Sequence, residues 1–511
     1  MKEAYKVVDV FAGPGGLGEG FAAFGYDTGK TPFKLAVSIE KESSAHSTLL
    51  LRSFYRQFPQ DDIPAEYWSY VREEISKAEL FNLYPKEFRA AAEEAQCIEL
   101  GTTPAKDVKN LIKQRLNGCE KWVLVGGPPC QAYSLVGRSR MRSTNPDFEQ
   151  DVRHFLYKEY LRIIADHRPP VFVMENVKGL LSAKHSGKKI IYNILEDLRR
   201  PDKAISGRST GLGYKLFSLV DDRPPESCEP ENFLVKAERF GIPQARHRVL
   251  ILGIREDIDM RPGVLTPSDT VTVNQAIADL PKIRSRVSKE EDSLDIWRDI
   301  LNSVTDARWY HKGMANGLLP VIQQIDSALE KLKQKNYGTG AEFLTYSRKP
   351  KIYSDWYRHG CEGIISNHAG RSHMRSDLHR YLFASSFAAT NGRSVQIDDF
   401  PKALLPAHKN VHDGREQDHF SDRFRVQLSD RPSTTITSHI SKDGHYFIHY
   451  DPAQCRSLTV REAARLQTFP DSYKFEGNKT SQYHQVGNAV PPLLSMQVAE
   501  IVHDILKRLR V

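Results

Sequence analysis

Short apolar runs alternate with amphipathic segments through the first half of the chain. The pattern predicts strands at residues 6–11, 34–39, 122–125, 171–174 and 249–254, and helices at 17–24 and 155–164. The strands are almost continuously apolar, which is typical of strands that are buried on both faces. Strands that alternate with helices in this way indicate an α/β domain, with a mostly parallel sheet covered by helices on both sides.

A helical insertion interrupts this alternation between about residues 42 and 105. Trp68, Val71 and Ile75 form one stripe at helical spacing, and Pro85 begins a second predicted helix that continues to Ala95. Proline is favoured in the first turn of a helix. We interpret the insertion as a structural elaboration of the domain.

The regular pattern weakens after about residue 263 and returns near residue 457. Helices are predicted at 273–280 and at 322–332, where Ile322, Ile325, Leu329 and Leu332 lie on one face. The segment 366–380 carries three arginines and three histidines against one aspartate. Such a segment is often a solvated surface, but basic residues near aromatic ones also suit phosphate contact and base stacking.

The composition is that of a globular protein outside the membrane. The 511 residues have a mean hydropathy of −0.50 and contain no apolar run of about 18 residues, so no membrane span or membrane partner is expected. The N-terminus lacks the pattern of a signal peptide, and a cytoplasmic location is expected. The net charge of +8 permits a nucleic-acid partner without requiring one.

The cysteines and histidines indicate neither disulfides nor a metal site. The six cysteines form no C-x-x-C pair. His359, Cys361, His368 and His373 lie close in sequence, but their spacing matches no usual zinc motif. We expect no metal, and interpret this stretch as a solvated or DNA-facing polar segment.

A glycine-rich turn follows the first predicted strand, within the segment 9–18. Glycines at a strand-to-helix turn let the backbone approach a ligand closely. The second strand ends at Glu40, where a carboxylate can accept the two hydroxyl groups of a ribose. Together these features suggest a cofactor that contains a nucleoside.

Four side chains near strand ends could carry chemistry. Cys130 follows a Gly-Gly-Pro-Pro turn after the strand at 122–125, and Glu175 follows the strand at 171–174. Arg246 and Arg248 precede the strand at 249–254. A lone cysteine is usually a small buried residue, but a thiol, a carboxyl group and two guanidinium groups can provide a nucleophile, a proton donor or acceptor, and electrostatic clamps.

In these features the chain resembles the DNA (cytosine-5)-methyltransferases. The resemblance rests on seven ordered blocks at residues 9–18, 38–41, 126–134, 175–177, 244–248, 431–437 and 485–492. It implies the Rossmann-like class I fold of S-adenosylmethionine-dependent methyltransferases, with a smaller, irregular target-recognition domain. The implied domains are a catalytic and cofactor-binding domain at 1–265, a recognition domain at 266–430, and C-terminal blocks at 431–511 that complete the catalytic domain.

The resemblance also implies a role for individual residues in methyl transfer to C5 of cytosine in duplex DNA. Cys130 would attack C6 of a flipped-out base, Glu175 would contact N3 and the exocyclic amine, and Arg248 would hold the O2 side with Arg246 nearby. The residues implied for substrate binding are Gln131, Ser134, Arg138 and Asn176. The residues implied for binding S-adenosyl-L-methionine are Phe11, Ala12, Gly13, Gly15, Gly16, Leu17, Glu40, Asp107, Val108, Pro129, Leu156, Asn488 and Val490.

Three functions remain to be compared. The first is a monomeric DNA methyltransferase of a restriction–modification or phage-defence system, with a cognate nuclease as a partner. The second is a tRNA cytosine-5 methyltransferase, which the long region 266–430 disfavours. The third is a non-catalytic protein that binds the cofactor or DNA, which the intact set of Cys130, Glu175, Arg246 and Arg248 disfavours.

Overall fold

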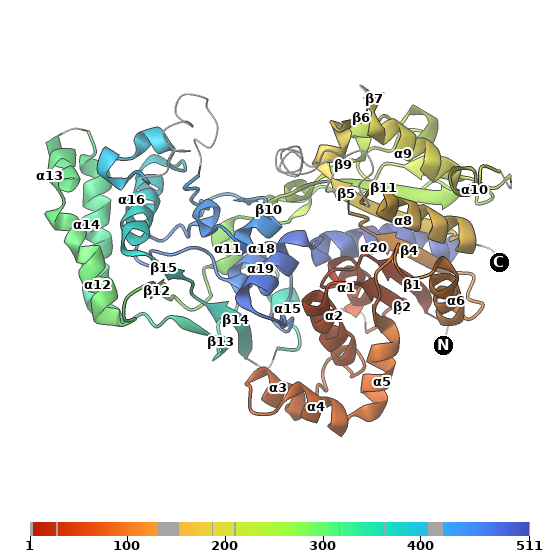
Figure 1. The fold of residues 1–511 in the computed structure, drawn as a ribbon, viewed down its shortest axis with the longest axis horizontal. Helices are drawn as coiled ribbons and strands as arrows, with labels where there is room; N and C mark the ends of the chain where they lie inside the picture. Colours follow the sequence, from red (N-terminus) through yellow and green to blue (C-terminus); the bar gives the residue numbers. More distant parts are fainter. Residues whose placement is uncertain are drawn as a thin grey trace. The chain divides into compact units, whose positions relative to one another are not determined.

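The structure is a computed structural model, and two compact units make up the chain. It describes residues 4–26, 29–129, 153–185, 188–208, 211–315, 317–361, 363–406 and 423–509. The first unit comprises Met1–Tyr70, Ile75–Asp269 and Ala489–Val511, and the second comprises Val71–Glu74 and Thr270–Asn488. Each unit is therefore assembled from segments that are far apart in the sequence (Figure 1).

An eight-stranded sheet forms the centre of the first unit, in the order β3-β2-β1-β4-β5-β11-β8, with β9 paired to β11. Its strands are β1 (Tyr5–Val10), β2 (Phe33–Glu40), β3 (Ala95–Cys97), β4 (Trp122–Gly126), β5 (Val171–Val177), β8 (Tyr214–Phe217), β9 (Leu234–Lys236) and β11 (His247–Arg255). The first five strands of that order are parallel, whereas β11 runs antiparallel to its neighbours. The predicted α/β class is confirmed, and every predicted strand overlaps an observed one.

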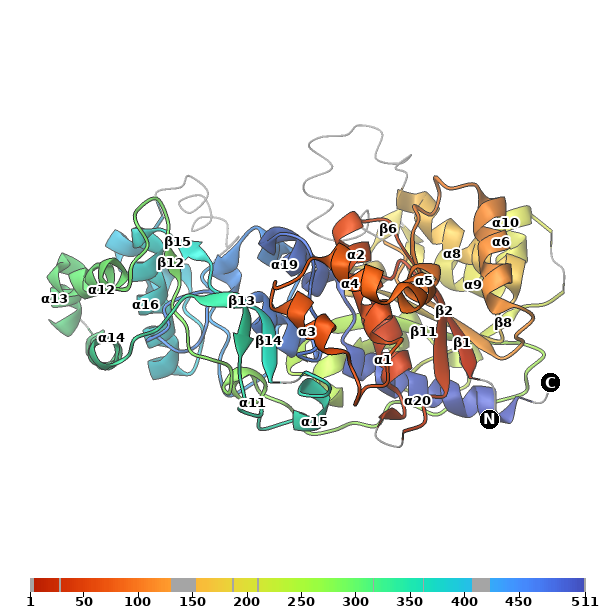
Figure 2. The ribbon, with the colours of Figure 1, turned by 90° about the horizontal axis from the view of Figure 1, so that it is seen from below.

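Helices cover both faces of this sheet, as the two views in Figures 1 and 2 show. One face carries α6 (Ala105–Leu116), α8 (Arg153–His167) and α9 (Ile190–Arg199), and a short α10 (Pro201–Ser206) follows α9. Ile112, Tyr160 and Ile194 from the three longer helices join Val10 and Met174 from the sheet in one buried core. This core fixes the positions of the strands, and the side chains of the candidate site lie at the ends of those strands.

The opposite face carries α1 (Gly16–Ala23) and α20 (Pro492–Arg508), which come from the two ends of the chain. The ring of Phe21 on α1 lies 5.1 Å from that of Phe33 on β2, in an edge-to-face arrangement. The hydroxyl group of Ser495 on α20 donates a hydrogen bond of 2.7 Å to the carbonyl of Leu17. The last helix is therefore part of the same layer as the first.

The predicted insertion contains more elements than the two helices that the sequence pattern indicates. Its elements are α2 (Ser43–Tyr55), α3 (Ala65–Val71), α4 (Lys77–Leu83), α5 (Pro85–Glu94) and β3. Pro85 begins α5, as predicted. The prediction that Ile75 belongs to the first helical stripe is wrong. The helix α3 ends at Val71, and Glu73 has a φ of 63°, so Ile75 lies outside the helix. The three residues of β3 extend the parallel sheet beside β2, but they are too few to show a strand pattern.

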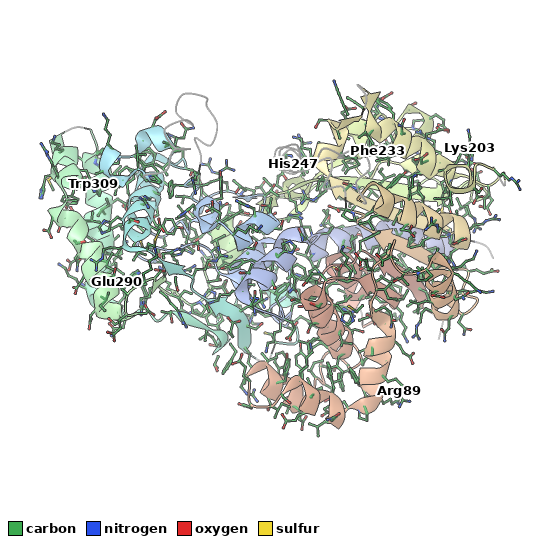
Figure 3. The ribbon with its side chains drawn as sticks, viewed as in Figure 1. Arg89, Lys203, Phe233, His247, Glu290 and Trp309 are labelled. Atoms are coloured by element: carbon green, nitrogen blue, oxygen red, sulfur yellow. The ribbon has the colours of Figure 1, made fainter. Side chains whose placement is uncertain are left out.

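The second unit is mostly helical around a core of its own. Its helices are α11 (Val273–Ile277), α12 (Leu294–Asn302), α13 (Arg308–Ala315), α14 (Leu319–Gln334), α15 (Ser354–Tyr357), α16 (Arg375–Asn391), α18 (Val460–Leu466) and α19 (Lys479–Asn488). Two small sheets pair β12 (Arg286–Val287) with β15 (Ser372–His373) and β13 (Gly340–Thr345) with β14 (Ile364–Ala369). The predicted helices at 273–280 and 322–332 are confirmed. Trp309 of α13, which is labelled in Figure 3, packs edge-on against Phe383 with ring centroids 5.7 Å apart.

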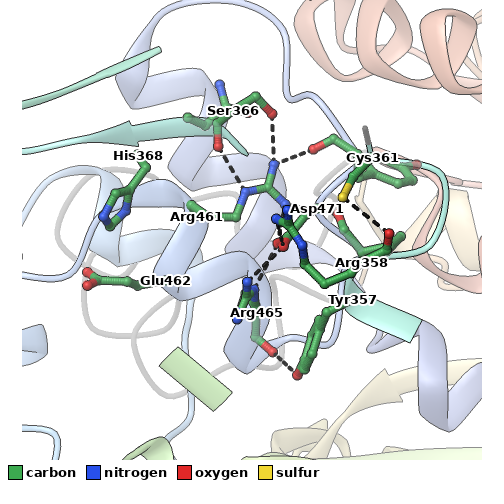
Figure 4. Close-up of polar contacts among 12 residues, drawn as sticks. Tyr357, Arg358, Cys361, Ser366, His368, Arg461, Glu462, Arg465 and Asp471 are labelled. Carbon is green, nitrogen blue, oxygen red and sulfur yellow. Dashed lines mark hydrogen bonds and ion pairs between the residues drawn. The ribbon is translucent and has the colours of Figure 1, made fainter. Parts of the chain in front are cut away.

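Buried ion pairs organise the part of the second unit around α18 (Figure 4). Arg465 binds Asp471 through Nη2 at 2.7 Å and Asp279 through Nη1 at 2.7 Å, and its side chain has no exposed surface. Arg358 reaches the same Asp471 at 3.1 Å. Arg461 donates to the carbonyl of Ser366 at 2.9 Å. Buried charges of this kind are tolerated only when they are fully paired, so the network restricts α18 to one arrangement.

Three of the four residues in the cluster His359, Cys361, His368 and His373 are internal, which corrects the interpretation of these three as solvated, whereas His359 is exposed. Cys361, His368 and His373 are buried. The ring of His368 contacts the hydroxyl group of Thr459 and the carbonyl of Pro281, both at 2.9 Å. Among the described residues, no group of three or more His, Cys, Asp and Glu side chains is placed to hold a metal ion. No helix in the described part of the chain is long and apolar enough to cross a membrane.

Candidate active site

The chain adds β2 and β3 on one side of β1 and then β4 on the other side. The direction in which strands are added therefore reverses between β1 and β4. The loops that leave β1 and β4 therefore diverge at the carboxyl edge of the sheet. In open parallel sheets, ligands bind in the crevice at such a switch point. The candidate site residues come from the ends of β1, β2, β4 and β5 and from the beginning of β11.

The turn after β1 is held in a conformation that needs glycine. Gly13 and Gly15 have φ values of 58° and 98°, and Phe11 also has a positive φ of 57°. The N–H of Ala12 donates to the carbonyl of Ile39 at 3.0 Å, which ties the turn to the end of β2. A Cβ atom added at Gly13 would meet no atom of the described structure within 4 Å. The turn thus borders open space at the carboxyl edge.

Glu40 connects this turn to the beginning of α2. One of its carboxylate oxygens accepts the N–H of Gly13 at 2.8 Å, and the other accepts the N–H of Glu42 at 2.7 Å. Glu40 is half-buried at the end of β2. A carboxylate oxygen has more than one lone pair, so these bonds leave acceptor capacity for the hydroxyl groups of a ribose.

The C-terminal block closes against the glycine turn in the first unit. A Cβ atom at Gly16 would lie 2.3 Å from the carbonyl oxygen of Val490. Only glycine allows so close an approach, since real Cβ atoms do not come within 3 Å of another atom. Val490 thus lies beside the turn, and its role in cofactor binding stays a prediction. Asn488 is exposed at the end of α19 and belongs to the second unit.

Asp9 lies beneath the turn and is fully buried. Its Oδ2 accepts the N–H of Gly18 at 3.2 Å, near the beginning of α1. Its Oδ1 is buried and makes no hydrogen bond within the described part of the chain. Burial raises the pKa of Asp9 to about 7, and the hydrogen bond from Gly18 opposes this only partly. The sequence analysis assigned no role to Asp9, although it begins the first block of the resemblance within an otherwise apolar strand.

Glu175 and Arg248 form an ion pair at the same edge. The Nε of Arg248 lies 2.8 Å from Oε1 of Glu175, and the two side chains are 12% and 13% exposed. Glu175 is paired with Leu250 in the antiparallel register of β5 and β11, so Arg248 is its diagonal neighbour on the same face of the sheet. The structure thus brings together two of the four side chains that the sequence analysis placed near strand ends.

Gly127 makes room for the Glu175 carboxylate. A Cβ atom at Gly127 would lie 2.9 Å from Oε2 of Glu175. The side chain of Asn176 is buried, and its Nδ2 donates to the carbonyl of Pro128 at 3.1 Å. The turn after β4 and the end of β5 are therefore fixed to each other. The sequence analysis did not single out Gly127, although the second glycine of the Gly-Gly-Pro-Pro run marks a close approach of this kind.

Arg246 is more deeply buried than Arg248, with 1% of its surface exposed. Burial and the neighbouring charge of Arg248 lower the pKa of Arg246 well below its usual value. Burial also lowers the pKa of Arg248, although the carboxylate of Glu175 opposes this. Two guanidinium groups beside one carboxylate give this edge a positive charge that suits an electron-rich ligand.

Several predicted residues lie elsewhere. Cys130, Gln131, Ser134 and Arg138 lie outside the described residues, whereas Pro129 ends the described part of the turn. Asp107 is exposed in the first turn of α6 and Val108 packs in the core, as does Leu156. The residue that leaves β3 beside Glu40 is Ile98, whose N–H donates to the Glu40 carbonyl at 3.0 Å. The roles of Asp107, Val108 and Leu156 stay predictions.

Comparisons with known proteins agree on one family. The model of the C-5 cytosine-specific DNA methylases matches residues 86–503. The chain is 32% identical to the type II methyltransferase M.Bpa9945I of Bacillus paralicheniformis, covering 98% of this chain and 99% of that one. It is 26% identical to the DNA (cytosine-5-)-methyltransferase M.ApeKI of Aeropyrum pernix, covering 80% and 86%. A solved prophage-encoded protein from E. coli, described as a DNA modification methyltransferase, is 18% identical, covers 99% of this chain and 100% of its own, and has a TM-score of 0.53.

Proposed function

The chain belongs to the C-5 cytosine-specific DNA methylase family, and from that premise we propose that it transfers a methyl group from S-adenosyl-L-methionine to C5 of a specific cytosine in double-stranded DNA. The observation that carries the proposal is the Glu175–Arg248 ion pair at the sheet edge, fixed to the turn that leads into Cys130. Several relatives are named type II methyltransferases, so a restriction–modification setting with a cognate nuclease is part of the proposal.

The residues at the turn after β1 suit S-adenosyl-L-methionine. The backbone at Gly13 borders open space, Glu40 keeps free acceptor capacity, and Val490 closes one side of the turn. Phe11 and Ile98 are the apolar residues placed to border the adenine ring, since they leave the ends of β1 and β3 on either side of Glu40. When it is bound, the cofactor supplies a methyl group that is electrophilic because it is attached to a sulfonium sulfur.

Glu175 and Arg248 act on the base. A target cytosine must leave the duplex to reach this edge, at a cost of a few kcal/mol. In its protonated form the Glu175 carboxyl group donates a hydrogen bond to N3, and its other oxygen accepts one from the exocyclic amine. As the thiolate adds to C6, this proton passes to N3 and leaves the carboxylate that pairs with Arg248. Arg248 holds this carboxyl group in place through its ion pair and directs its remaining donors to the O2 side of the base. Protonation at N3 makes C6 more electrophilic.

Cys130 is the proposed nucleophile, by resemblance to the family. Its thiolate adds to C6, the C5–C6 double bond opens, and the electron pair makes C5 nucleophilic. Once C5 carries the new methyl group, a base removes the C5 proton, N3 returns its proton to Glu175, and cleavage of the Cys130–C6 bond restores the C5–C6 double bond and frees the thiolate. Arg246 and Arg248 bring positive charge to the edge from which the segment containing Cys130 departs.

The second unit is the proposed target-recognition domain. It spans Thr270–Asn488 together with Val71–Glu74, which is longer than the range 266–430 expected from the sequence. The names of the relatives favour a DNA substrate over tRNA.

Methyl transfer from radiolabelled S-adenosyl-L-methionine tests this proposal directly. Purified protein should label mixed-sequence duplex DNA and leave tRNA unlabelled, and Cys130→Ser should abolish the transfer. Cys119→Ser serves as the matched control, because Cys119 is only half-buried and bonds a backbone carbonyl outside the site. Activity that persists in Cys130→Ser would exclude this nucleophile, and preferential labelling of tRNA would exclude the DNA substrate.

A further inference from the structure

A basic cavity of about 450 Å³ is lined entirely by residues of the second unit. Four basic side chains line it, and they come from four separate segments. Arg286 begins β12, Arg371 precedes β15, Lys442 follows the turn at Ser438–Ser441, and Lys479 begins α19. Side chains from such distant parts of the sequence meet only through the fold; of the four, only Arg371 belongs to the basic segment 366–380 noted in the sequence.

The other ionisable groups of the cavity do not neutralise these charges. Asp377 is paired with Arg380 at 2.7 Å, and the carboxylate of Asp443 accepts the N–H of His445 at 2.9 Å. Burial lowers the pKa of His373 to about 3 and also lowers the pKa of His445. Both imidazoles are therefore neutral near pH 7, and the cavity keeps a net positive charge.

Arg371 is held in position before any ligand arrives. Its guanidinium group stacks on the ring of Tyr483, with 4.1 Å between Cζ and the ring centroid. One nitrogen of the group donates to the carbonyl of Ser441 at 2.8 Å. A guanidinium group has five N–H donors, so this arrangement leaves others that can face the cavity. An arginine with a fixed orientation loses little side-chain entropy when it binds.

Lys479 is placed among like charges. Its ammonium group donates to the carbonyl of Gly370 at 3.3 Å. Burial and the positive charges of Arg286 and Arg371 lower the pKa of Lys479, although Glu342 opposes this shift. An anion in the cavity would relieve that repulsion. Arg286 and Lys442 are exposed, and their side chains have no ion pair or hydrogen bond with any described residue.

We propose that this cavity binds a phosphate group of the DNA backbone and so positions the duplex on the second unit. The inference rests on the proposed function, because it takes DNA as the substrate. Phosphate is the anion that two guanidinium and two ammonium groups suit best, since arginine contacts it through paired donors and lysine as a point charge. A contact of this kind fixes the register of the DNA and carries no sequence information.

The test uses the full chain and a labelled duplex of mixed sequence. Dissociation constants are measured by fluorescence anisotropy between about 50 and 200 mM salt. The double variant Arg286→Gln/Lys442→Gln should bind roughly tenfold more weakly at the lower salt, and equally so for different sequences. For this variant, the slope of the logarithm of the DNA association constant against the logarithm of the salt concentration should be smaller in magnitude by about 0.9 for each lost phosphate contact.

The matched control is Lys312→Gln/Lys331→Gln, which removes the same charge from exposed positions on α13 and α14. This control should keep the slope of the wild-type protein. If both double variants change the slope equally, the effect is one of net charge and the proposal is wrong. If neither double variant changes the slope while the wild-type protein methylates DNA, the proposed phosphate site is wrong and the proposed function stands. A wild-type protein that neither binds nor methylates DNA contradicts the proposed function itself.

A separate arm distinguishes a DNA phosphate from a free one. Inorganic phosphate replaces chloride at constant ionic strength while thermal unfolding and DNA binding are followed. If the cavity binds a DNA phosphate, inorganic phosphate should weaken DNA binding by the wild-type protein and should have little effect on DNA binding by Arg286→Gln/Lys442→Gln. If inorganic phosphate stabilises only the wild-type protein and leaves its DNA binding unchanged, the cavity is a site for a free anion and the proposal is overturned.

Discussion

The Nε of Arg248 lies 2.8 Å from Oε1 of Glu175, across the antiparallel pair of β11 and β5. Because Glu175 pairs with Leu250 in this register, the contact is diagonal and depends on the register of the two strands. Under the proposed function, proton transfer at the base thus depends on a carboxyl group that a neighbouring strand holds in place.

Replacing Glu175 by glutamine should remove most of the activity and leave the fold unchanged. The amide has the same shape but can neither take up nor release a proton at N3. We expect methyl transfer to fall by about 10²- to 10⁴-fold, with a normal circular dichroism spectrum. The control Glu256→Gln removes a surface carboxylate that pairs with Arg200 just beyond the other end of β11. An equal loss of activity in both variants would show that Glu175 has no special role.

A single methyl group at Gly127 should displace the Glu175 carboxylate. The added Cβ atom would lie 2.9 Å from Oε2, and the flexible carboxylate would move before the backbone does. For Gly127→Ala we expect methyl transfer to fall by about ten- to a hundredfold, because small misplacements of a reacting group are costly. Gly263→Ala is the control, since its Cβ atom would meet no neighbour within 4 Å. Unchanged transfer in Gly127→Ala would mean that the carboxylate position is not critical.

The pKa of Asp9 predicts a pH-dependent contribution to stability. Burial raises this pKa to about 7 in the folded protein, whereas an unfolded aspartate titrates near 4. The folded state therefore binds the proton more tightly, and stability is lost as the pH rises from about 4 to above 7. Asp9→Asn should be more stable than the wild-type protein at pH 8, by roughly 2–4 kcal/mol, and should lose this advantage towards pH 4.

Urea unfolding at several pH values measures this effect. The control Asp269→Asn removes one charge at an exposed position, and its difference from the wild-type protein should not follow the same pH dependence. A stability difference for Asp9→Asn that stays constant between pH 5 and 8 would contradict the raised pKa.

Removing Arg465 should destabilise the second unit more than any surface arginine. Its loss leaves Asp471 and Asp279 buried without their shared partner. For Arg465→Met we expect a loss of about 3–5 kcal/mol in the free energy of unfolding, since an uncompensated buried charge remains. Arg431→Met breaks an exposed pair with Asp430 and should change the free energy by less than about 1 kcal/mol. Urea denaturation followed by circular dichroism distinguishes these outcomes.

Five of the eight strands of the central sheet could be predicted because they have strong local patterns. The strands that became β1, β2, β4, β5 and β11 are each apolar runs bounded by turns. The strand β3 could not be predicted, because three residues have no periodicity and its identity comes only from pairing with β2. The burial of His368 and His373 was not predicted for a similar reason. The sequence of a polar stretch is the same whether its hydrogen-bond partners are water or the buried groups around α18.

The sequence by itself determined the α/β class, the order of the functional blocks and the residue types at the ends of the strands, because these depend on neighbours along the chain. Only the tertiary structure decided which of these side chains meet. The contact between Glu175 and Arg248, the space that Gly127 leaves, the raised pKa of Asp9 and the basic cavity around Arg371 all depend on segments far apart in the sequence. Hydrogen bonding, desolvation and charge interactions act over a few ångströms in space, so distance along the chain does not reveal them.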